Sequence, residues 1–392
     1  MTVDAPAPIS TLKDLKAALQ LAIGLELSTI PVYLTALYSL KEGHNTDVAV
    51  AIRSVVMEEM LHMTLAANVL NALGEVPCTA PVDFQSRRNL SPIPAYPLES
   101  PLVSGIGKLD LRPLTPEAVA GFVRIEHPLH GAAELADIPL SSSGYRTIGQ
   151  FYNAIDHALG DRTVCPDDAF EPLRQVPGSA YYGGAGRVIE VTDRETARQA
   201  VRTILDQGEG LPEEYLHEPA KKVTDADRLG SGWQMYSHYA RFREIQTGRR
   251  FRTDQLAEDP PAGAMLLVDY SAVHPALSVP RNFHTLGSSE AAALDAFDLA
   301  YSELVDDVYL AFARRPRQVS SPPVADPGRD RPTLQPAVHG MYALKIRAIT
   351  LMRTPNPAAP GRTLCPRFAY VPPGGDRDKL VQDVATMRGL HR

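Results

Sequence analysis

Residues 55–70 read VVMEEMLHMTLAANVL and contain the pair Glu59 and His62. These two residues are three positions apart, just under one α-helical turn, so their side chains leave the helix on the same side. Apolar residues spaced three or four apart occupy that side as well, namely Ile52, Val55, Ala66 and Leu70. The pattern therefore predicts that a carboxylate and an imidazole point into the core of a helical protein.

A buried carboxylate of this kind calls for compensation, because an ionised group in the core is costly without a cation or a hydrogen-bond network. A Glu-x-x-His pair on a buried helix face is how di-iron carboxylate bundles hold metal. The alternative is a core histidine with satisfied hydrogen bonds beside a surface Glu59. For one such pair taken alone, this alternative is the commoner situation.

A second acidic residue interrupts an apolar stripe nearer the N-terminus. Between Leu12 and Leu37 large apolar side chains recur every three or four residues, and Glu26 takes one of these positions. The stripe predicts a long helix that Pro31 should bend about one turn past Glu26. For Glu26 alone, the alternative is a buried carboxylate paired with an arginine or a tyrosine.

The next helix is expected from Asp47 to Leu73, after a short turn at residues 43–45. A short connection makes two helices antiparallel neighbours. Glu26 and Glu59 lie at similar distances before and after the turn. The two carboxylates should therefore face each other at about the same height, which raises the probability of a metal site above that for the single pair.

Two later glutamates also occupy candidate positions. A helix should begin at residues 115–117 and stop before Pro128, which places Glu126 in its last turn, where the helix dipole disfavours a carboxylate without a cation. An arginine partner for Glu126 is about equally plausible. Another helix, capped by Thr192 or Asp193, should end in Gln-Gly-Glu-Gly at 207–210, and Glu209 in this turn lies on the inward side.

A helix predicted from Trp233 to Ile245 places His238 on its apolar face. In the symmetric di-iron pattern Met235 would be a glutamate, and we interpret Glu209 as its replacement. Arg241 is one turn from His238 and is expected either to bind a substrate carboxylate or, more conservatively, to pair with Glu244. A lone core histidine remains the alternative for His238.

The rest of the chain predicts an irregular excursion at 75–114 and a Pro-rich link or lid at 315–336. The sequence favours further helices at 145–159, 288–313 and 337–352, short strands at 187–191 and 264–268, and an irregular tail. The expected organisation is a disordered tail at 1–11, a bundle at 12–250 and a C-terminal extension at 251–392 whose two helices pack on the bundle.

Composition narrows the class of protein. The chain has 392 residues, 44% of them hydrophobic, and a net charge of −7, which argues against a general binder of nucleic acid or anionic membranes. Three widely spaced cysteines and no leader-like N-terminus predict a reducing, cytoplasmic location. The weakly charged stretch at 16–41 is long enough to span a bilayer, but its Glu26, Gly24, Pro31 and hydroxyls favour a buried helix.

The chain resembles the ferritin-like family that includes the iminophenyl-pyruvate dimer synthases of violacein and indolocarbazole pathways. The resemblance spans about residues 12–353, weakly after 300, and rests on LELSTIPVYLTALYSL, VVMEEMLHMTLAANVLNALG, VRIEHP, IGQFYNAI, ILDQGEG and SHYARFREI. It implies a mainly α, ferritin-like helical bundle, here elaborated with long Pro-rich loops and extra C-terminal helices. It also implies a set of metal ligands, Glu26, Glu59 and His62 with Glu126, Glu209 and His238.

The ligand set is rich in oxygen and nitrogen and contains no thiolate, which favours iron, or alternatively manganese. We therefore expect a non-haem iron oxidase or oxygenase of secondary metabolism that holds one or two ions, with Glu59 or Glu126 bridging. Its expected partners are a small organic substrate, O2 or peroxide, and a reductase, and a homodimer is compatible. Tyr33 would line the pocket or pass an electron, or it is an ordinary core aromatic.

Two rival functions follow from the same residues. The first is a ferritin-like scaffold without metal, binding a hydrophobic ligand or a partner enzyme, which the loss of a ligand at Met235 would favour. The second is iron storage, which the Pro-rich excursions argue against. The known synthases are much longer than this chain, so their dimerising reaction is not transferred to it.

Overall fold

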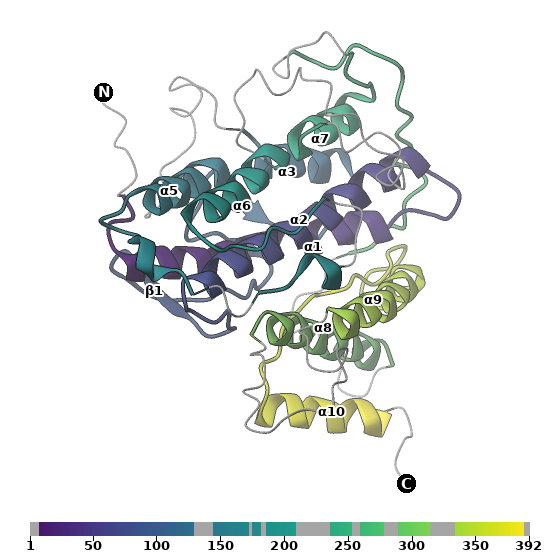
Figure 1. The fold of residues 1–392 in the computed structure, drawn as a ribbon. Coiled ribbons are helices and arrows are strands. Elements are labelled where there is room, and N and C mark those ends of the chain that lie inside the picture. The colour runs from purple at the N-terminus through teal and green to yellow at the C-terminus, as the bar shows by residue number, and fades with distance from the viewer. Residues whose placement is uncertain are drawn as a thin grey trace.

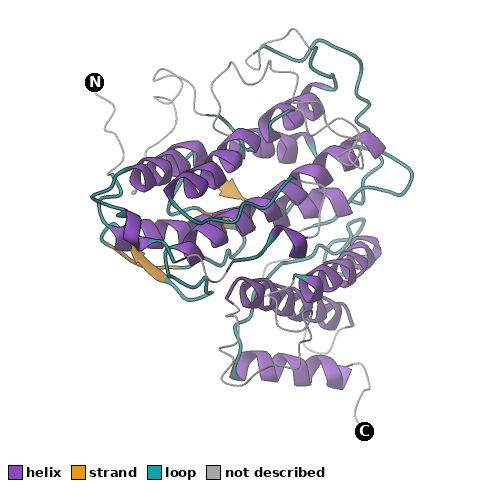
Figure 2. Ribbon diagram, in the orientation of Figure 1, coloured by secondary structure: helices purple, strands orange, loops and turns teal. Residues whose placement is uncertain are grey.

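The computed structural model describes residues 8–128, 144–171, 175–181, 186–208, 236–252, 259–277, 289–313 and 334–387. These parts of the chain are mainly helical, and their strands form two small antiparallel hairpins. Helices α1 and α2 run through the middle of the molecule, with α3, α5, α6 and α7 on one side of them and α8, α9 and α10 on the other (Figure 1). Figure 2 shows the small share of strand. The predicted mainly helical bundle is confirmed.

The two central helices are α1 (Leu12–Tyr38) and α2 (Thr46–Ala72), each 27 residues long. The side chain of Thr11 caps α1, and the helix continues through Pro31. Both helices are buried on most of their circumference, as expected for helices that are apolar nearly all round. The most apolar window of α1 is long enough to cross a membrane but is 89% buried within the fold, which supports its assignment as a core helix.

The turn between α1 and α2 forms hydrogen bonds with a loop at Asp269, more than 200 residues later in the chain. Asn45 adopts a left-handed backbone conformation with φ 50°. Its side-chain amide donates to the carbonyl of Asp269 at 2.8 Å and accepts from the amide of Asp269 at 2.7 Å. Gly74, with φ +78°, follows the end of α2 as predicted. The antiparallel arrangement of α1 and α2 is therefore fixed at both ends of α2.

Four shorter helices cover one side of this pair, namely α3 (Pro116–Ile125), α5 (Ile148–Gly160), α6 (Arg194–Gln207) and α7 (His238–Thr247). Each begins with a side-chain cap, because an oxygen accepts from an N–H of the first turn. The caps are Thr115, Thr147, Asp193 and Ser237. The first three helices lie where the sequence predicts them. α7 begins at its cap, later than the predicted start at 233, and residues 233–235 lie outside the described part.

Residues 75–114 form the expected irregular excursion, with slightly more strand than predicted. Two hairpins lie within it, β1 with β2 and β3 with β4. Their bounds are Val82–Phe84, Arg87–Leu90, Leu98–Glu99 and Lys108–Leu109. The excursion packs against the N-terminal half of α1, where Gly24 meets the backbone of Pro92.

The two strands predicted at 187–191 and 264–268 are wrong. At 187–191 side-chain amides take the place of a partner strand: Asn68 donates to the carbonyl of Ile189, and Gln175 binds both backbone groups of Val191. At 264–268 the structure has a single bridge, between Met265 and Arg249. Both segments have the apolar pattern of a strand, but no described neighbour offers them a complete ladder.

The C-terminal helices are α8 (Ser289–Ala313), α9 (Gln335–Arg353) and α10 (Gly375–Met387). α8 and α9 contact each other and the α1–α2 pair. α10 corrects the prediction of an irregular tail, since Val384 packs on Ala296 and Leu299 of α8. Its sequence is too polar to have shown an apolar stripe. Most of the link predicted at 315–336 lies outside the described residues.

Replacement of Gly24 by alanine should destabilise the protein. The added carbon would lie 2.2 Å from the carbonyl oxygen of Pro92, so one backbone must move. We expect the free energy of unfolding to fall by about 1–3 kcal/mol, measured by equilibrium denaturation. Gly121→Ala in α3 is the control, because no atom lies within 4 Å of its added carbon. Equal stability of the two variants would contradict the close contact.

Candidate metal centre

Three of the predicted ligands meet where α1 and α2 pack together. Glu26, Glu59 and His62 are all buried, with no more than 4% of any of them exposed. Nδ1 of His62 lies 3.4 Å from a carboxylate oxygen of Glu26 and 3.9 Å from one of Glu59. The antiparallel packing thus brings the two carboxylates to one point, as the position of the turn suggested.

A second cluster adjoins the first. Nδ1 of His238, in the first turn of α7, lies 3.1 Å from Glu59 and 3.4 Å from Glu126. Glu126 caps the C-terminus of α3, and neither it nor His238 has measurable exposure. The imidazole rings of His62 and His238 are stacked with their centroids 5.3 Å apart. Glu59 therefore belongs to both clusters, in the position of a carboxylate shared by two neighbouring ions.

The Nε2 atom of each histidine, on the side of the ring away from the carboxylates, contacts a side chain that was not predicted from the sequence. Nε2 of His62 lies 3.0 Å from the amide oxygen of Gln207, the last residue of α6. Nε2 of His238 lies 2.8 Å from the carboxylate of Glu58. These contacts leave both Nδ1 atoms facing the carboxylates, which is the arrangement that outer hydrogen bonds give to metal-binding histidines.

Two tyrosines hold the outer carboxylates in the same way. The hydroxyl of Tyr152, on α5, donates to Glu26, and the hydroxyl of Tyr33 donates to Glu126. Tyr33 is fully buried against Phe122 and Phe242. It is thus a core aromatic that also contacts Glu126, and its predicted role in passing an electron stays a prediction.

Arg241 forms an ion pair with Glu58, the residue whose carboxylate contacts Nε2 of His238. Its guanidinium lies 2.7 Å from Glu58, and it also donates to the Ser54 hydroxyl and to the carbonyl of Tyr236. The predicted pairing with Glu244 is wrong, because Glu58 is within reach on α2, a contact that helix spacing along α7 cannot reveal. Only 1% of Arg241 is exposed, and the predicted contact with a substrate carboxylate stays a prediction.

Burial and mutual interactions shift the pKa values of three groups in the centre. Burial and the charges of Glu126 and Glu26 raise the pKa of Glu59 well above its usual range. Burial lowers the pKa of His238, but the charge of Glu126 and hydrogen bonds to carboxylates outweigh it and raise this pKa well above normal. For Glu26, burial is outweighed by His62 and its other hydrogen-bond partners, so its pKa falls. Divalent ions would displace protons from these groups.

The residues fit such ions. In each of the two triads, Glu26–Glu59–His62 and Glu59–Glu126–His238, one donor atom per residue lies within 4.8 Å of the others. Oε2 of Glu126 and Nδ1 of His238 are both buried and lie 3.4 Å apart, but neither forms an aligned hydrogen bond with the other or with any other described residue. A cavity of about 10 Å³ lies at this point, enough for about one water-sized sphere. A cation site requires buried oxygen or nitrogen atoms that can coordinate a metal, beside a small space, and these two atoms meet that requirement.

The end of α6 comes very close to the centre. A carbon added at Gly208 would lie 3.1 Å from the carbonyl oxygen of Ile204 and 3.7 Å from the ring of His62. Glycine thus permits the close approach that the Gln-Gly-Glu-Gly motif predicts. Glu209, the next residue, and Met235 lie outside the described part of the chain, so the replacement proposed between them stays a prediction.

Three residues of the centre, Glu58, Tyr152 and Gln207, were not predicted from the sequence, although each lies in one of the stretches that carry the family resemblance. Glu58 adjoins Glu59 in the quoted stretch, and Tyr152 falls in a stripe that reads as ordinary core. Gln207 belongs to the Gln-Gly-Glu-Gly motif, where the glutamate attracted attention. Their contacts join segments that are more than 100 residues apart, and helix periodicity carries no information on such contacts.

Gln207→Ala should weaken metal binding without unfolding the protein. The variant removes the hydrogen bond that orients His62, and loss of such an outer contact typically lowers metal affinity by about 10–100-fold. Titration of the metal-free protein with Co²⁺ or Fe²⁺ measures the change. Gln199→Ala, an exposed position on the same helix, is the control and should bind as the unaltered protein does. Unchanged affinity in Gln207→Ala would contradict this role.

Comparison with known proteins identifies the family and the fold of this chain. A family model described as Ferritin-like matches residues 19–247, which include all six predicted ligands. A solved ferritin-like protein from Caulobacter vibrioides shares the fold with a TM-score of 0.56, over 93% of this chain and all of that one. The identity of 20% makes this a likeness of fold alone.

Two curated relatives are biosynthetic enzymes. Dichlorochromopyrrolate synthase from Lentzea aerocolonigenes is 27% identical over 253 residues, which are 52% of this chain and 23% of that protein. The 2-imino-3-(indol-3-yl)propanoate dimerase from Chromobacterium violaceum is 26% identical over 268 residues, 61% of this chain and 24% of that enzyme. The matches thus cover about a quarter of each relative.

Proposed function

The chain belongs to the ferritin-like family, and from this premise we propose that it is a non-haem iron oxidoreductase that oxidises a small organic substrate in secondary metabolism. The single observation that supports this most is the meeting of three carboxylates and two imidazoles at one buried point, with two donor atoms that form no aligned hydrogen bond in the described part. The names of the two relatives, both biosynthetic enzymes, support the class of substrate.

In this proposal Glu26, Glu59 and His62 hold one ion, and Glu59, Glu126 and His238 hold a second. Glu209 completes the set from the turn after α6. Oxygen and imidazole donors suit iron, and manganese as the alternative. Bound iron supplies the exchange of electrons with O2 or peroxide, which protein side chains cannot perform.

The other residues of the site position these ligands. The hydroxyls of Tyr152 and Tyr33 each donate a hydrogen bond to one outer carboxylate, which fixes the oxygen that faces the centre. Glu58 holds the proton on Nε2 of His238, and Arg241 neutralises Glu58. Arg241 is accordingly proposed as a positioning residue. Burial of the whole set keeps water from the centre and strengthens each of these interactions.

An anomalous-scattering map at the iron edge tests the proposal. Crystals of protein purified without chelators and supplied with ferrous iron should show one or two peaks among the five residues. Parallel measurement of O2 consumption by the ferrous protein tests the redox step. Absence of any peak under these conditions would overturn the proposal in favour of the metal-free scaffold.

A further inference from the structure

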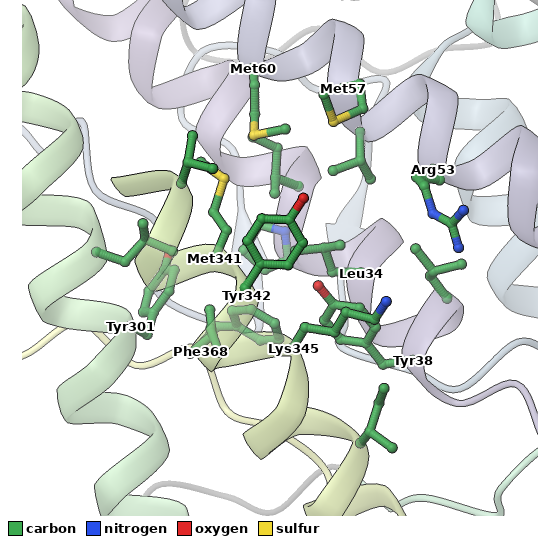
Figure 3. A pocket seen from close by; sticks show the side chains of 18 of the residues that line it. Leu34, Tyr38, Arg53, Met57, Met60, Tyr301, Met341, Tyr342, Lys345 and Phe368 are labelled. Carbon is green, nitrogen blue, oxygen red and sulfur yellow. The ribbon is translucent and has the colours of Figure 1, made fainter. Parts of the chain in front are cut away.

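A cavity of about 700 Å³ lies between the α1–α2 pair and the C-terminal helices α8 and α9. This volume is in the range of small-molecule sites, about 300–1,000 Å³. Figure 3 shows side chains from both sides converging on it. It is far larger than the space at the metal centre, and the two share no lining residue.

The α1–α2 pair separates the cavity from the centre. Met60 and Met63 line the cavity, and each directly follows a predicted ligand on α2. Consecutive residues of a helix point about 100° apart, so the two sets leave α2 on different faces. In Figure 1 the ligand-bearing α3 and α7 lie on the other side of α1 and α2 from α8 and α9. A molecule in the cavity therefore cannot contact the metal centre.

One side of the cavity is apolar and adaptable. In the view of Figure 3, Met60 and Met341 lie on one side, above Tyr301 and Phe368. Methionine side chains are flexible and polarisable, and they adjust to apolar molecules of different shapes. This side would accept an aliphatic or aromatic body without selecting one shape.

The opposite side carries positive charge. Arg53 lies there, with Lys345 beside Tyr38 (Figure 3). Neither cation has an ion-pair partner within the described ranges, whereas Glu42, the acidic residue among the described lining residues, lies 3.4 Å from Arg353. Lys41 adds a further cation to the lining. The cavity is thus mainly apolar at one side, where Tyr301 adds one buried hydroxyl, and cationic, with the hydroxyl of Tyr38, at the other.

We propose that this cavity is a second binding site, distinct from the metal centre, for a small organic monocarboxylate with an apolar body. The carboxylate would accept from Arg53, Lys345 and the hydroxyl of Tyr38. The apolar body would pack on the methionine side. This arrangement matches each half of such a molecule with the chemistry of the wall it meets.

Calorimetric titration of the full chain with decanoate tests the site. We expect one decanoate per chain, and 1-decanol, which lacks the charge, should bind at least 10-fold more weakly. The double variant Arg53→Gln/Lys345→Gln should weaken decanoate binding by at least 10-fold and leave decanol unchanged. Its control is Lys13→Gln/Arg88→Gln, which makes the same change of charge at exposed residues outside the lining. Equal affinity for decanoate and decanol would overturn the proposal.

Met341→Trp tests the location, since the larger side chain on α9 should block binding of both molecules while metal binding persists. Unchanged decanoate binding in this variant would also overturn the proposal. So would a dimer of the unaltered protein that Met341→Trp dissociates, because a second copy would then occupy the cavity. Glu59→Ala should bind decanoate normally, which keeps this test independent of the metal centre.

Discussion

The Glu59→Ala variant is expected to bind neither of the two proposed ions, with a fall in metal affinity of more than 100-fold at both positions. Glu59 is the one residue that belongs to both triads of the described chain. Each ion would lose a ligand, and the negative charge between the two would be removed at the same time. Metal analysis by mass spectrometry and titration of the metal-free protein measure the loss, and oxidase activity should fall to background.

Thermal stability provides an independent readout of the same variant. A ligand present at 100 times its dissociation constant stabilises the native state by about 2.7 kcal/mol, so ferrous iron should raise the melting temperature of the unaltered protein. The Glu59→Ala protein should show no such rise. Without metal, however, it should be as stable as the unaltered protein or more so, because the cost of burying the Glu59 carboxylate and its repulsion by Glu126 and Glu26, which together raise its pKa, are gone.

Glu75→Ala is the matched control, since it makes the same chemical change at an exposed position. It should retain the metal content and the metal-dependent rise in melting temperature. The idea of a shared carboxylate fails if Glu59→Ala keeps a full complement of iron. It fails equally if only one of two ions is lost.

The second large effect is expected from Arg241→Met. This change leaves the carboxylate of Glu58 buried without its cation, and loss of one partner from a buried ion pair typically costs about 3–5 kcal/mol. Equilibrium denaturation measures the change in the free energy of unfolding. His238 should also lose its fixed orientation, so that the affinity of the second ion falls.

A double variant separates the ion pair from simple packing. Glu58→Leu/Arg241→Met replaces both charges by apolar groups and should recover most of the lost stability, since a buried pair is often neutral against an apolar replacement. Metal affinity should not recover with it, because His238 still lacks its anchor. Arg202→Met, at an exposed arginine 3.7 Å from the partly buried Asp156, should change stability by no more than about 0.5 kcal/mol. An equally mild effect of Arg241→Met would refute the buried pairing.

The sequence predicted the central helices and much of the candidate centre because both depend on local rules. Helical spacing identified Glu59 with His62, and the short turn brought Glu26 beside them. Glu126 was predicted from the last turn of one later helix and His238 from the apolar face of another, the family resemblance implied the ligand set as a whole, and the structure brings Glu126 and His238 to the same point. The positions of these residues followed from periodicity, caps and the geometry of a two-helix hairpin, whereas their grouping into one ligand set followed from the family resemblance.

The remaining features depend on contacts that no local rule specifies. Tyr152 meets Glu26 because α5 crosses α1, and Glu58 meets Arg241 because α7 lies on α2. The apolar segments at 187–191 and 264–268 read as strands, but their backbone groups find other partners. Helix α10 escaped prediction because it contributes only a few apolar contacts to the fold.

The wide separation of the ligands along the chain has a consequence for biosynthesis. Glu26, Glu59 and His62 leave the ribosome early, whereas His238 follows more than 170 residues later. At typical translation speeds of about 5–20 residues per second, the interval is roughly 10–35 s. During this time the nascent hairpin presents an incomplete set of donors to the cellular metal pool. If the proposed ions bind, complete loading therefore has to wait until α7 is synthesised and brings His238 to the cluster.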